Sequence, residues 1–525
     1  MDWLLFFYWG FFFLYIFCKV YKSNKSIYHM KFYFKLITAI ICCVLVAPSI
    51  LVAQNTDSLV LKKSETLRYA TLVNDYFMRN YPDVGANSYV GGKERNSKIW
   101  TRSVYYEGLM ALYNQYPEAK WLAYAEDWGN FHQWISSNDN AKRHADFLCC
   151  GQAYLDLYML KPDLEIRKTH IKSRIEEILA TDIVNDWYWI DAIQMAMPIF
   201  AQLGSIEKDN RYFEQMYQMY MYTRNKHGGS KKGGGTPLFN QADGLWYRDY
   251  QYDPPYTDKI ETDKPCYWSR GNGWVYMALA RVLHYSPDTV AHKEQYISDF
   301  KAMSLALKKC QREDGFWSVS LAAPTNYGHI DSSGKETSGT ALFVAGMAYG
   351  INSGLLDKDT YLPCVIRGWN AMCKDVVHSD GFLGYVQGAG ACPEDGQPVL
   401  YDKAPDFEDF GIGCYLLAAA GVYQLGDIDL RTLSSLDSKS SYDDKFLSCQ
   451  ASEKELLISL SMAQQQNIFL DILNMNGAVQ KHLPEQNLSA GEHQLTIPID
   501  LLPGIYVCVL RTSRSVLNQK FAVIR

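Results

Sequence analysis

Two aspartates that begin apolar segments are the first candidates for chemistry. Asp191 follows two tryptophans in the segment DWYWIDAIQMAMP, and Asp146 lies in RHADFLCCG. An acid in the first turn of a helix can serve only as a partner of the helix dipole. Burial beside tryptophan, however, raises the pKa of a carboxyl group, as a general acid near neutral pH requires. We therefore predict that Asp191 is a general acid. For Asp146 two roles stay open: a part in the reaction, or a helix cap paired with Arg143 or His144.

A third candidate is the segment YWSRGNGW, which holds Trp268, Arg270 and Trp274. The forked guanidinium group of arginine matches a carboxylate with two hydrogen bonds. Aromatic rings on either side of it offer flat faces to a ligand. The combination indicates a site for an anionic sugar such as a uronate. The alternative is structural, with the arginine paired to an acid at a helix end among tryptophans of the core.

Other kinds of site have little support in the sequence. His227, His329 and His378 are scattered without a metal-binding spacing, so we expect no metal and no cofactor. The sequence has no G-x-S-x-G elbow and no Cys–His pattern, which disfavours nucleophilic acyl chemistry. The glycine-rich residues 226–237 follow no strand and indicate a surface loop. A net charge of −6 at pH 7 argues against a nucleic-acid binder, which needs a surplus of Lys and Arg.

The aromatic content stands out in an otherwise ordinary globular composition. The 525 residues include 13 Trp, 38 Tyr and 23 Phe, so aromatic side chains make up 14% of the chain. This content fits either a large core or a cleft that stacks rings on sugars, and composition alone leaves both open. The length predicts more than one domain.

A helical pattern recurs six times between residues 58 and 425. Each copy begins with small residues and continues as an apolar run, at residues 102–113, 145–158, 187–204, 270–285, 336–352 and 409–426. Amphipathic stretches separate them, at residues 164–179, 209–224, 292–310 and 358–376. Helices that are apolar nearly all round are buried, and helices with one polar face are exposed. The pattern predicts an all-α (α/α)6 barrel over residues 54–430. The loops before its inner helices are expected to gather at one end.

The two ends of the chain lack the helical pattern of the middle region. Residues 1–53 have the parts of a secretory leader, with a signal peptide that starts at Met30, the expected true start, and ends at Ala53. We therefore expect export. Residues 431–525 contain a polar linker and then alternating segments at residues 455–462, 467–474, 493–499 and 504–511, which predict a small β-sandwich. For the ten cysteines after the leader we expect buried free thiols, with one or two disulfide bridges.

Residues 58–425 resemble glycoside hydrolase family 105, the unsaturated rhamnogalacturonyl hydrolases, which are related to the unsaturated glucuronyl hydrolases of family 88. The resemblance rests on the WID motif that ends at Asp191, on Asp146 with Gly151, and on the segments YWSRGNGW, ETSGTALF and DFGIGCYLLA. It implies that Asp191 is the general acid/base and Asp146 its partner. It further implies that the subsite for an unsaturated uronate is lined by Trp100, Trp189, Trp268, Arg270 and Trp274.

The sequence departs from the family pattern in two places. Family members often carry a histidine where the segment GLWYRD has Arg248, which we count among the substrate-binding residues. A His-Lys pair that often precedes the Trp-x-Asp motif is absent from LATDIVNDWYWID. Both changes concern the identity of the sugar more than the reaction. The parent polysaccharide and the oligomeric state stay open.

The reaction that the resemblance implies removes a Δ4,5-unsaturated uronic acid from the non-reducing end of oligosaccharides left by a lyase, of pectin or rhamnogalacturonan type. The acid protonates C4 of the vinyl ether and water adds at C5, after which the hemiketal opens and the glycosidic bond breaks. One carboxyl group of raised pKa is enough for this sequence of steps. Two alternatives are a sugar epimerase on the same barrel, for which paired histidines would be expected, and a non-catalytic oligosaccharide-capture protein.

The C-terminal segment LLPGIYVCVLRTSRSVLNQKFAVIR resembles the sorting domain of type IX secretion. The resemblance implies that secretion machinery recognises this domain, and that the chain reaches the periplasm, the outer-membrane surface or the medium. A generic β-sandwich, or a carbohydrate-binding module, is the alternative.

Overall fold

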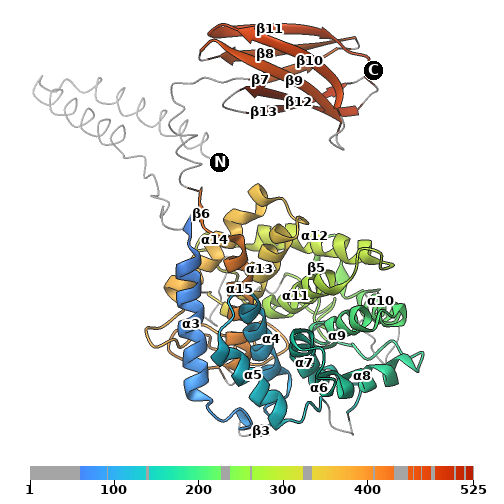
Figure 1. The fold of residues 1–525 in the computed structure, drawn as a ribbon, viewed down its shortest axis with the longest axis vertical. Helices are drawn as coiled ribbons and strands as arrows, with labels where there is room; N and C mark the ends of the chain where they lie inside the picture. The colour runs from blue at the N-terminus through green and yellow to red at the C-terminus, as the bar shows by residue number, and fades with distance from the viewer. Residues whose placement is uncertain are drawn as a thin grey trace, which may run out of the picture. The chain divides into compact units, whose positions relative to one another are not determined.

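A computed structural model of the chain describes a helical region and a β-strand region (Figure 1). The described residues are 60–90, 93–136, 141–225, 237–259, 263–322, 334–405, 408–430, 447–452, 454–462, 464–474, 479–501, 504–512 and 516–523. The predicted leader, most of the linker and all but the last residue of the predicted loop at residues 226–237 lie outside them. Within the described residues, no helix is both long enough and apolar enough to cross a membrane.

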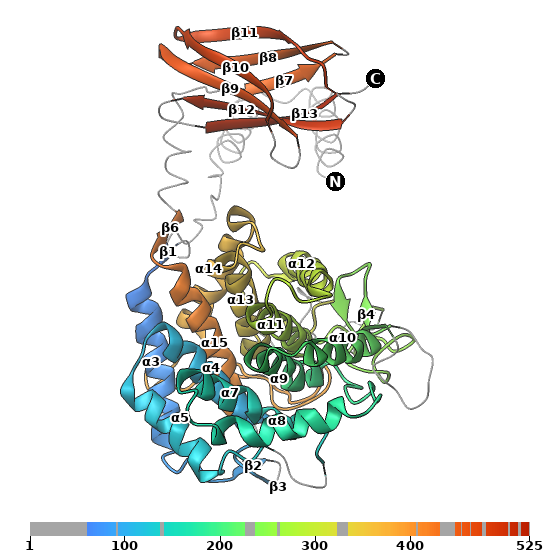
Figure 2. The same cartoon turned by 45° about the vertical axis from the view of Figure 1, so that its right-hand side comes forward.

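The predicted buried helices are confirmed and form the inner ring of the barrel. They are α4 (Trp100–Gln115), α6 with α7 (Ala145–Leu148 and Cys150–Leu160), α9 (Asp191–Glu207), α11 (Ser269–Tyr285), α13 (Thr337–Asn352) and α15 (Asp409–Leu425). Neighbouring inner helices pack on one another, and α15 packs on α4, so the ring closes. Figure 2 shows α9, α11 and α13 side by side. A Cβ atom on Gly108 would lie 2.3 Å from the carbonyl oxygen of Gly413, so glycine permits the closest approach in the ring.

A second set of helices, each with one buried face, surrounds the inner ring. These outer helices are α3 (Lys63–Asn80), α5 (Ala119–Phe131), α8 (Ile166–Leu179), α10 (Asn210–Asn225), α12 (Lys293–Cys310) and α14 (Lys358–Asp375). Strand β1 (Val60–Leu61) pairs antiparallel with β6 (Ile428–Asp429), which joins the beginning of the helical region to its end. The (α/α)6 prediction is therefore confirmed over the described helices.

Backbone hydrogen bonds connect the loops that precede the inner helices. The Ile190 amide donates to the Arg248 carbonyl (2.9 Å), the Ser269 amide to Val319 (2.9 Å) and the Thr337 amide to Tyr385 (2.9 Å). The short hairpins β2–β3 (Ser88–Val90, Lys93–Arg95) and β4–β5 (Phe239–Asn240, Leu245–Trp246) belong to the same connecting segments. These cross-links hold the loops in fixed places at the N-terminal ends of the inner helices.

The C-terminal strands form the predicted β-sandwich. One sheet has the order β10-β9-β12-β13 and the other β11-β8-β7. The strands are β7 (Leu447–Ala451), β8 (Glu455–Met462), β9 (Gln466–Asn474), β10 (Val479–Leu488), β11 (Gly491–Pro498), β12 (Gly504–Thr512) and β13 (Val516–Val523). The sequence pattern predicted β8, β9, β11 and β12 but not β7, β13 or β10, the last of which is polar and contains Pro484. This strand lies at a sheet edge and its register shifts between Leu483 and Gln486, where a proline is tolerated.

The structure agrees with one part of the cysteine prediction and differs from the other. Cysteines in the described residues are free thiols, and most of them are buried, as expected. The one or two expected disulfide bridges are not formed among them.

Candidate active site

Asp191 is the first residue of the inner helix α9 and is buried, with 6% of its surface exposed. Burial raises the pKa of its carboxyl group above the usual value, while the positive charges of Arg248 and Arg270 act in the opposite direction. The free backbone amides at a helix start favour a negative charge. Asp191 thus has the raised pKa that its sequence context predicted, together with groups that stabilise its ionised form.

Arg248 lies directly against Asp191. Its Nε donates to the Asp191 Oδ2 at 3.2 Å, and its Nη1 donates to Asp249. The Arg248 side chain is 21% exposed, whereas those of Asp191 and Asp249 are 8% and 5% exposed. One partly accessible guanidinium group is therefore shared by two buried carboxylates. Asp249 was not among the predicted residues. The sequence feature that could have identified it is its position next to Arg248 in GLWYRD.

Asp146 lies in the short helix α6, close enough to Asp191 for their charges to interact. Burial raises the pKa of Asp146, and the charge of Asp191 raises it further, while His144 lowers it. The His144 Nδ1 accepts from the Asp146 amide at 3.3 Å and lies 3.9 Å from the Asp146 Oδ2. Arg143 instead binds Asp186. Asp146 therefore contacts His144, one of its two predicted structural partners, and also lies near Asp191.

Trp189 is a buried aromatic side chain two residues before Asp191, and it packs against His144, the residue that contacts Asp146. It is 5% exposed, and its ring centroid lies 5.0 Å from that of His144 and 4.5 Å from that of Tyr188. Tyr188 is 43% exposed, although it stands between two buried tryptophans. Tyr188 was not among the predicted residues, and it presents an accessible ring against Trp189.

Trp100 and Trp274 meet at the ends of two other inner helices. Their ring centroids lie 6.3 Å apart in an edge-to-face arrangement, and Trp100 also packs against Phe410 at 5.5 Å. The indole nitrogen of Trp274 is buried and has no hydrogen-bond partner among the described residues. The structure thus brings the N-terminal parts of α4, α11 and α15 together, as predicted for the loop end of the barrel.

Arg270 is almost fully buried, and its guanidinium group donates hydrogen bonds to backbone carbonyl groups. Nη1 donates to the Gln387 carbonyl and Nη2 to the Gly388 carbonyl, both at 2.7 Å. The guanidinium carbon lies 4.7 Å from the ring of Trp268, whose indole nitrogen donates to the Gln387 side chain at 2.9 Å. Arg270 and Trp268 therefore anchor the loop around Gln387. The predicted contact of Arg270 with a carboxylate stays a prediction.

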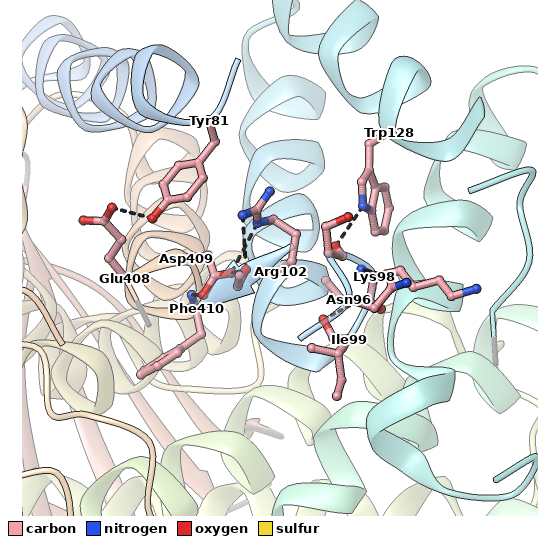
Figure 3. Close-up of polar contacts among 12 residues, drawn as sticks. Tyr81, Asn96, Lys98, Ile99, Arg102, Trp128, Glu408, Asp409 and Phe410 are labelled. Atoms are coloured by element: carbon pink, nitrogen blue, oxygen red, sulfur yellow. Dashed lines mark hydrogen bonds and ion pairs between the residues drawn. The ribbon is translucent and has the colours of Figure 1, made fainter. Parts of the chain in front are cut away.

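A second aspartate–arginine pair lies at the start of α15 (Figure 3). The Arg102 Nε donates to the Asp409 Oδ2 at 3.2 Å, and the side chains are 0% and 3% exposed. The neighbouring Glu408 accepts from the Tyr81 hydroxyl at 2.7 Å. Burial raises the pKa values of Glu408 and Asp409. This pair is closed off by its neighbours, so we assign it to the scaffold.

Metal ligation has no support in the part of the chain that the structure describes. No group of three or more His, Cys, Asp or Glu side chains there is placed to hold a metal ion. The side chains that the structure brings together at this site are carboxyl groups, an arginine and aromatic rings.

Comparison with known proteins identifies the family. The model of Glycosyl Hydrolase Family 88 matches residues 69–425. The chain belongs to glycoside hydrolase family 88. It is therefore a glycoside hydrolase, and the resemblance to family 105 and its relative family 88 seen in the sequence is confirmed.

Two curated relatives carry the same name, unsaturated 3S-rhamnoglycuronyl hydrolase. The protein from Formosa agariphila is 29% identical over 62% of this chain and 84% of its own length. The protein from Alteromonas sp. is 27% identical over 62% of this chain and 78% of its own length.

Solved structures agree with the family and the fold. A family 88 glycosyl hydrolase from Bacteroides vulgatus is 30% identical, with a TM-score of 0.60 over 69% of this chain and 99% of that one. A family 105 glycoside hydrolase from C. acetobutylicum is 17% identical with a TM-score of 0.51, over 67% of this chain and 99% of that one. This second likeness concerns the fold alone.

Proposed function

We propose that this family 88 enzyme removes a Δ4,5-unsaturated uronic acid from the non-reducing end of oligosaccharides produced by a lyase. The observation that carries the proposal is the buried carboxyl group of Asp191 at the head of α9, between Asp146 and Arg248. The names of the two curated relatives support an unsaturated uronate joined to rhamnose as the substrate unit. A parent polysaccharide with alternating rhamnose and uronate is therefore the first choice for a test.

Asp191 acts in both halves of the proposed reaction. Burial raises its pKa, which favours the protonated form, and the protonated carboxyl group donates its proton to C4 of the vinyl ether. The resulting carboxylate then accepts a proton from the water that adds at C5. The hemiketal opens and the glycosidic bond breaks, so one carboxyl group serves as acid and base in turn. Asp146 is its partner, because the charges of the two carboxyl groups interact and the ionised form of one disfavours ionisation of the other.

Arg248 has the opposite effect on the same carboxyl group. Its positive charge lowers the pKa of Asp191 and stabilises the carboxylate that exists after the first proton transfer. Its fixed Nε–Oδ2 contact also orients the carboxyl group. Because the Arg248 side chain is partly accessible, it is also the arginine that we propose for contact with the uronate carboxylate.

Loss of ultraviolet absorbance tests the proposal, because hydration removes the double bond of the unsaturated uronate. We expect the purified full chain to abolish the absorbance of rhamnose-linked unsaturated disaccharides and to release the uronate. Substrates whose terminal uronate is saturated should be untouched. An epimerase would leave the absorbance unchanged while altering the sugar, and a capture protein would bind the oligosaccharide without turnover. Either result would overturn the proposal.

We further propose that the enzyme is exported and that its C-terminal β-sandwich is a sorting domain. The support is the leader pattern at residues 1–53 and the sequence of the last strands. In the native host, a chain that ends at residue 436 should accumulate in the periplasm with unchanged specific activity. If truncation instead lowers activity on long oligosaccharides only, the sandwich is a binding module.

A further inference from the structure

Two of the cysteines lie in the β-sandwich, one in each sheet. Cys449 is in β7 of the three-stranded sheet, and Cys508 is in β12 of the four-stranded sheet. The other free cysteines of the described residues belong to the helical region. The sandwich therefore carries a pair of thiols that its fold, and not its sequence, can bring together.

Both side chains point into the same core. On β12, Tyr506, Cys508 and Leu510 are buried, and Cys508 has no exposed surface. On β7, Cys449 packs against that core together with Leu447. Alternate residues of a strand face the same side of a sheet, so each cysteine belongs to the inner face of its own sheet. Both cysteine side chains thus lie in the core between the two sheets.

The two thiols also contact each other directly. A side-chain hydrogen bond joins Cys449 and Cys508. It lowers the pKa of the Cys449 thiol and raises that of Cys508. Cys449 is only partly buried, so a reagent can reach it, whereas Cys508 is enclosed.

We propose that Cys449 and Cys508 form a disulfide bond that ties the two sheets together when the chain meets an oxidising protein disulfide. The Cys449 thiolate attacks that disulfide, forms a mixed disulfide and displaces one thiolate of the oxidant. The Cys508 thiol then loses its proton and attacks the Cys449 sulfur, which displaces the second thiolate. Two S–H bonds are lost and one S–S bond forms, and the two electrons reduce the oxidant from disulfide to dithiol.

Other cysteines in the described helical region have different neighbours. The Cys149 thiol donates to Glu107, and that of Cys373 lies 3.3 Å from the Tyr415 hydroxyl. A small sandwich buries a modest core and gains from a cross-link between distant strands, because the link restricts the unfolded chain. The proposal does not rest on the proposed catalytic function.

Peptide mapping of the full chain tests the bond. The protein is purified with reductant, exposed to oxidised glutathione and digested without reduction. We expect a peptide containing Cys449 joined to one containing Cys508, with a mass two hydrogens below the sum of the two. The control Cys310→Ser, a partly buried cysteine of α12, should leave this species intact, and Cys449→Ser should abolish it. Recovery of both cysteines as separate alkylated peptides, or their linkage to other cysteines, would overturn the proposal.

A stability measurement on the wild-type chain gives a second test that needs no variant. Reductant should lower the temperature at which the oxidised sandwich unfolds and leave turnover of the unsaturated substrate unchanged. In Cys449→Ser, which keeps the core residue Cys508, reductant should have no effect on that temperature. An oxidised wild-type protein that unfolds at the same temperature with and without reductant would contradict the proposed tie between the sheets.

Discussion

Two aspartate–arginine pairs stand at the starts of inner helices in this barrel, Asp191–Arg248 at α9 and Asp409–Arg102 at α15. Each has an Nε–Oδ2 distance of 3.2 Å, and burial raises the aspartate pKa in each. Their surroundings differ. The Arg248 side chain is 21% exposed, whereas that of Arg102 is fully enclosed. A buried aspartate beside an arginine at a helix start therefore does not identify a catalytic residue.

Two features distinguish the Asp191–Arg248 pair from the Asp409–Arg102 pair. A second carboxyl group lies nearby, and side chains around it are partly exposed. Asp146 lies near Asp191, and the exposed ring of Tyr188 borders the same region. Around Asp409, the hydroxyl of Ser88 accepts a hydrogen bond from Arg102. The hydroxyl of Tyr81 donates to the adjacent Glu408, as Figure 3 shows. Groups at the second pair are directed at one another, which suits a scaffold. At the first pair, the Arg248 side chain stays partly exposed.

The sharpest test of this comparison replaces each aspartate by asparagine. Asp191→Asn should lower turnover of the unsaturated substrate by about 10²–10⁴-fold, because the general acid is lost while the shape is kept. Asp409→Asn should retain the specific activity of its folded fraction. Absorbance kinetics measure turnover, and circular dichroism checks folding. A folded Asp191→Asn protein with activity within a few-fold of wild type would show that Asp191 is not the acid.

The two substitutions should affect the free energy of unfolding in the reverse order, with the larger loss in Asp409→Asn. Asp409→Asn leaves the charge of Arg102 buried without its carboxylate, and breaking a buried pair in this way costs about 3–5 kcal/mol. Arg248 keeps a second partner in Asp249 and is partly exposed, so Asp191→Asn should cost much less. Denaturant unfolding of the two variants gives the comparison. Equal losses of unfolding free energy would mean that the two pairs have the same structural role.

The pH dependence of kcat/KM tests the electrostatics around Asp191, which faces Arg248, Arg270 and Asp146. A general acid must be protonated, so activity falls as the pH rises through its pKa. Arg248→Met removes a positive charge that lowers the pKa, and the basic limb should move to higher pH by roughly one unit. Asp249→Asn removes a competing carboxylate from Arg248 and should move the limb to lower pH. Shifts in the same direction would refute this account.

The smallest expected effect is a loss of ligand binding when Arg270 is replaced. Because its fork holds two backbone carbonyls, Arg270→Lys should weaken the binding of an anionic sugar and of its neutral analogue to a similar extent, by a few-fold. Calorimetric titration of both ligands into the folded variant measures this. Selective loss of the anionic ligand would instead support the direct carboxylate contact that the sequence suggested.

The sequence by itself determined the architecture and the placement of most candidate residues. Apolar periodicity is a local property, so it was sufficient to tell inner from outer helices and to place Asp191 at the head of α9. The same reasoning predicted four strands of the sandwich and missed β7, β10 and β13. In β10, the polar residues and Pro484 obscure the pattern of an edge strand.

Only the tertiary structure decided which partners these residues have. Arg248 and Arg270 were both candidates, and contacts with segments far away in the chain separated them, since Arg270 binds Gln387 and Gly388 while Arg248 binds Asp191. The contact between Cys449 and Cys508 was equally invisible, because it joins strands of different sheets. Hydrogen bonds and ion pairs depend on distances between packed elements. A linear pattern records the period of each element but not which element lies beside it.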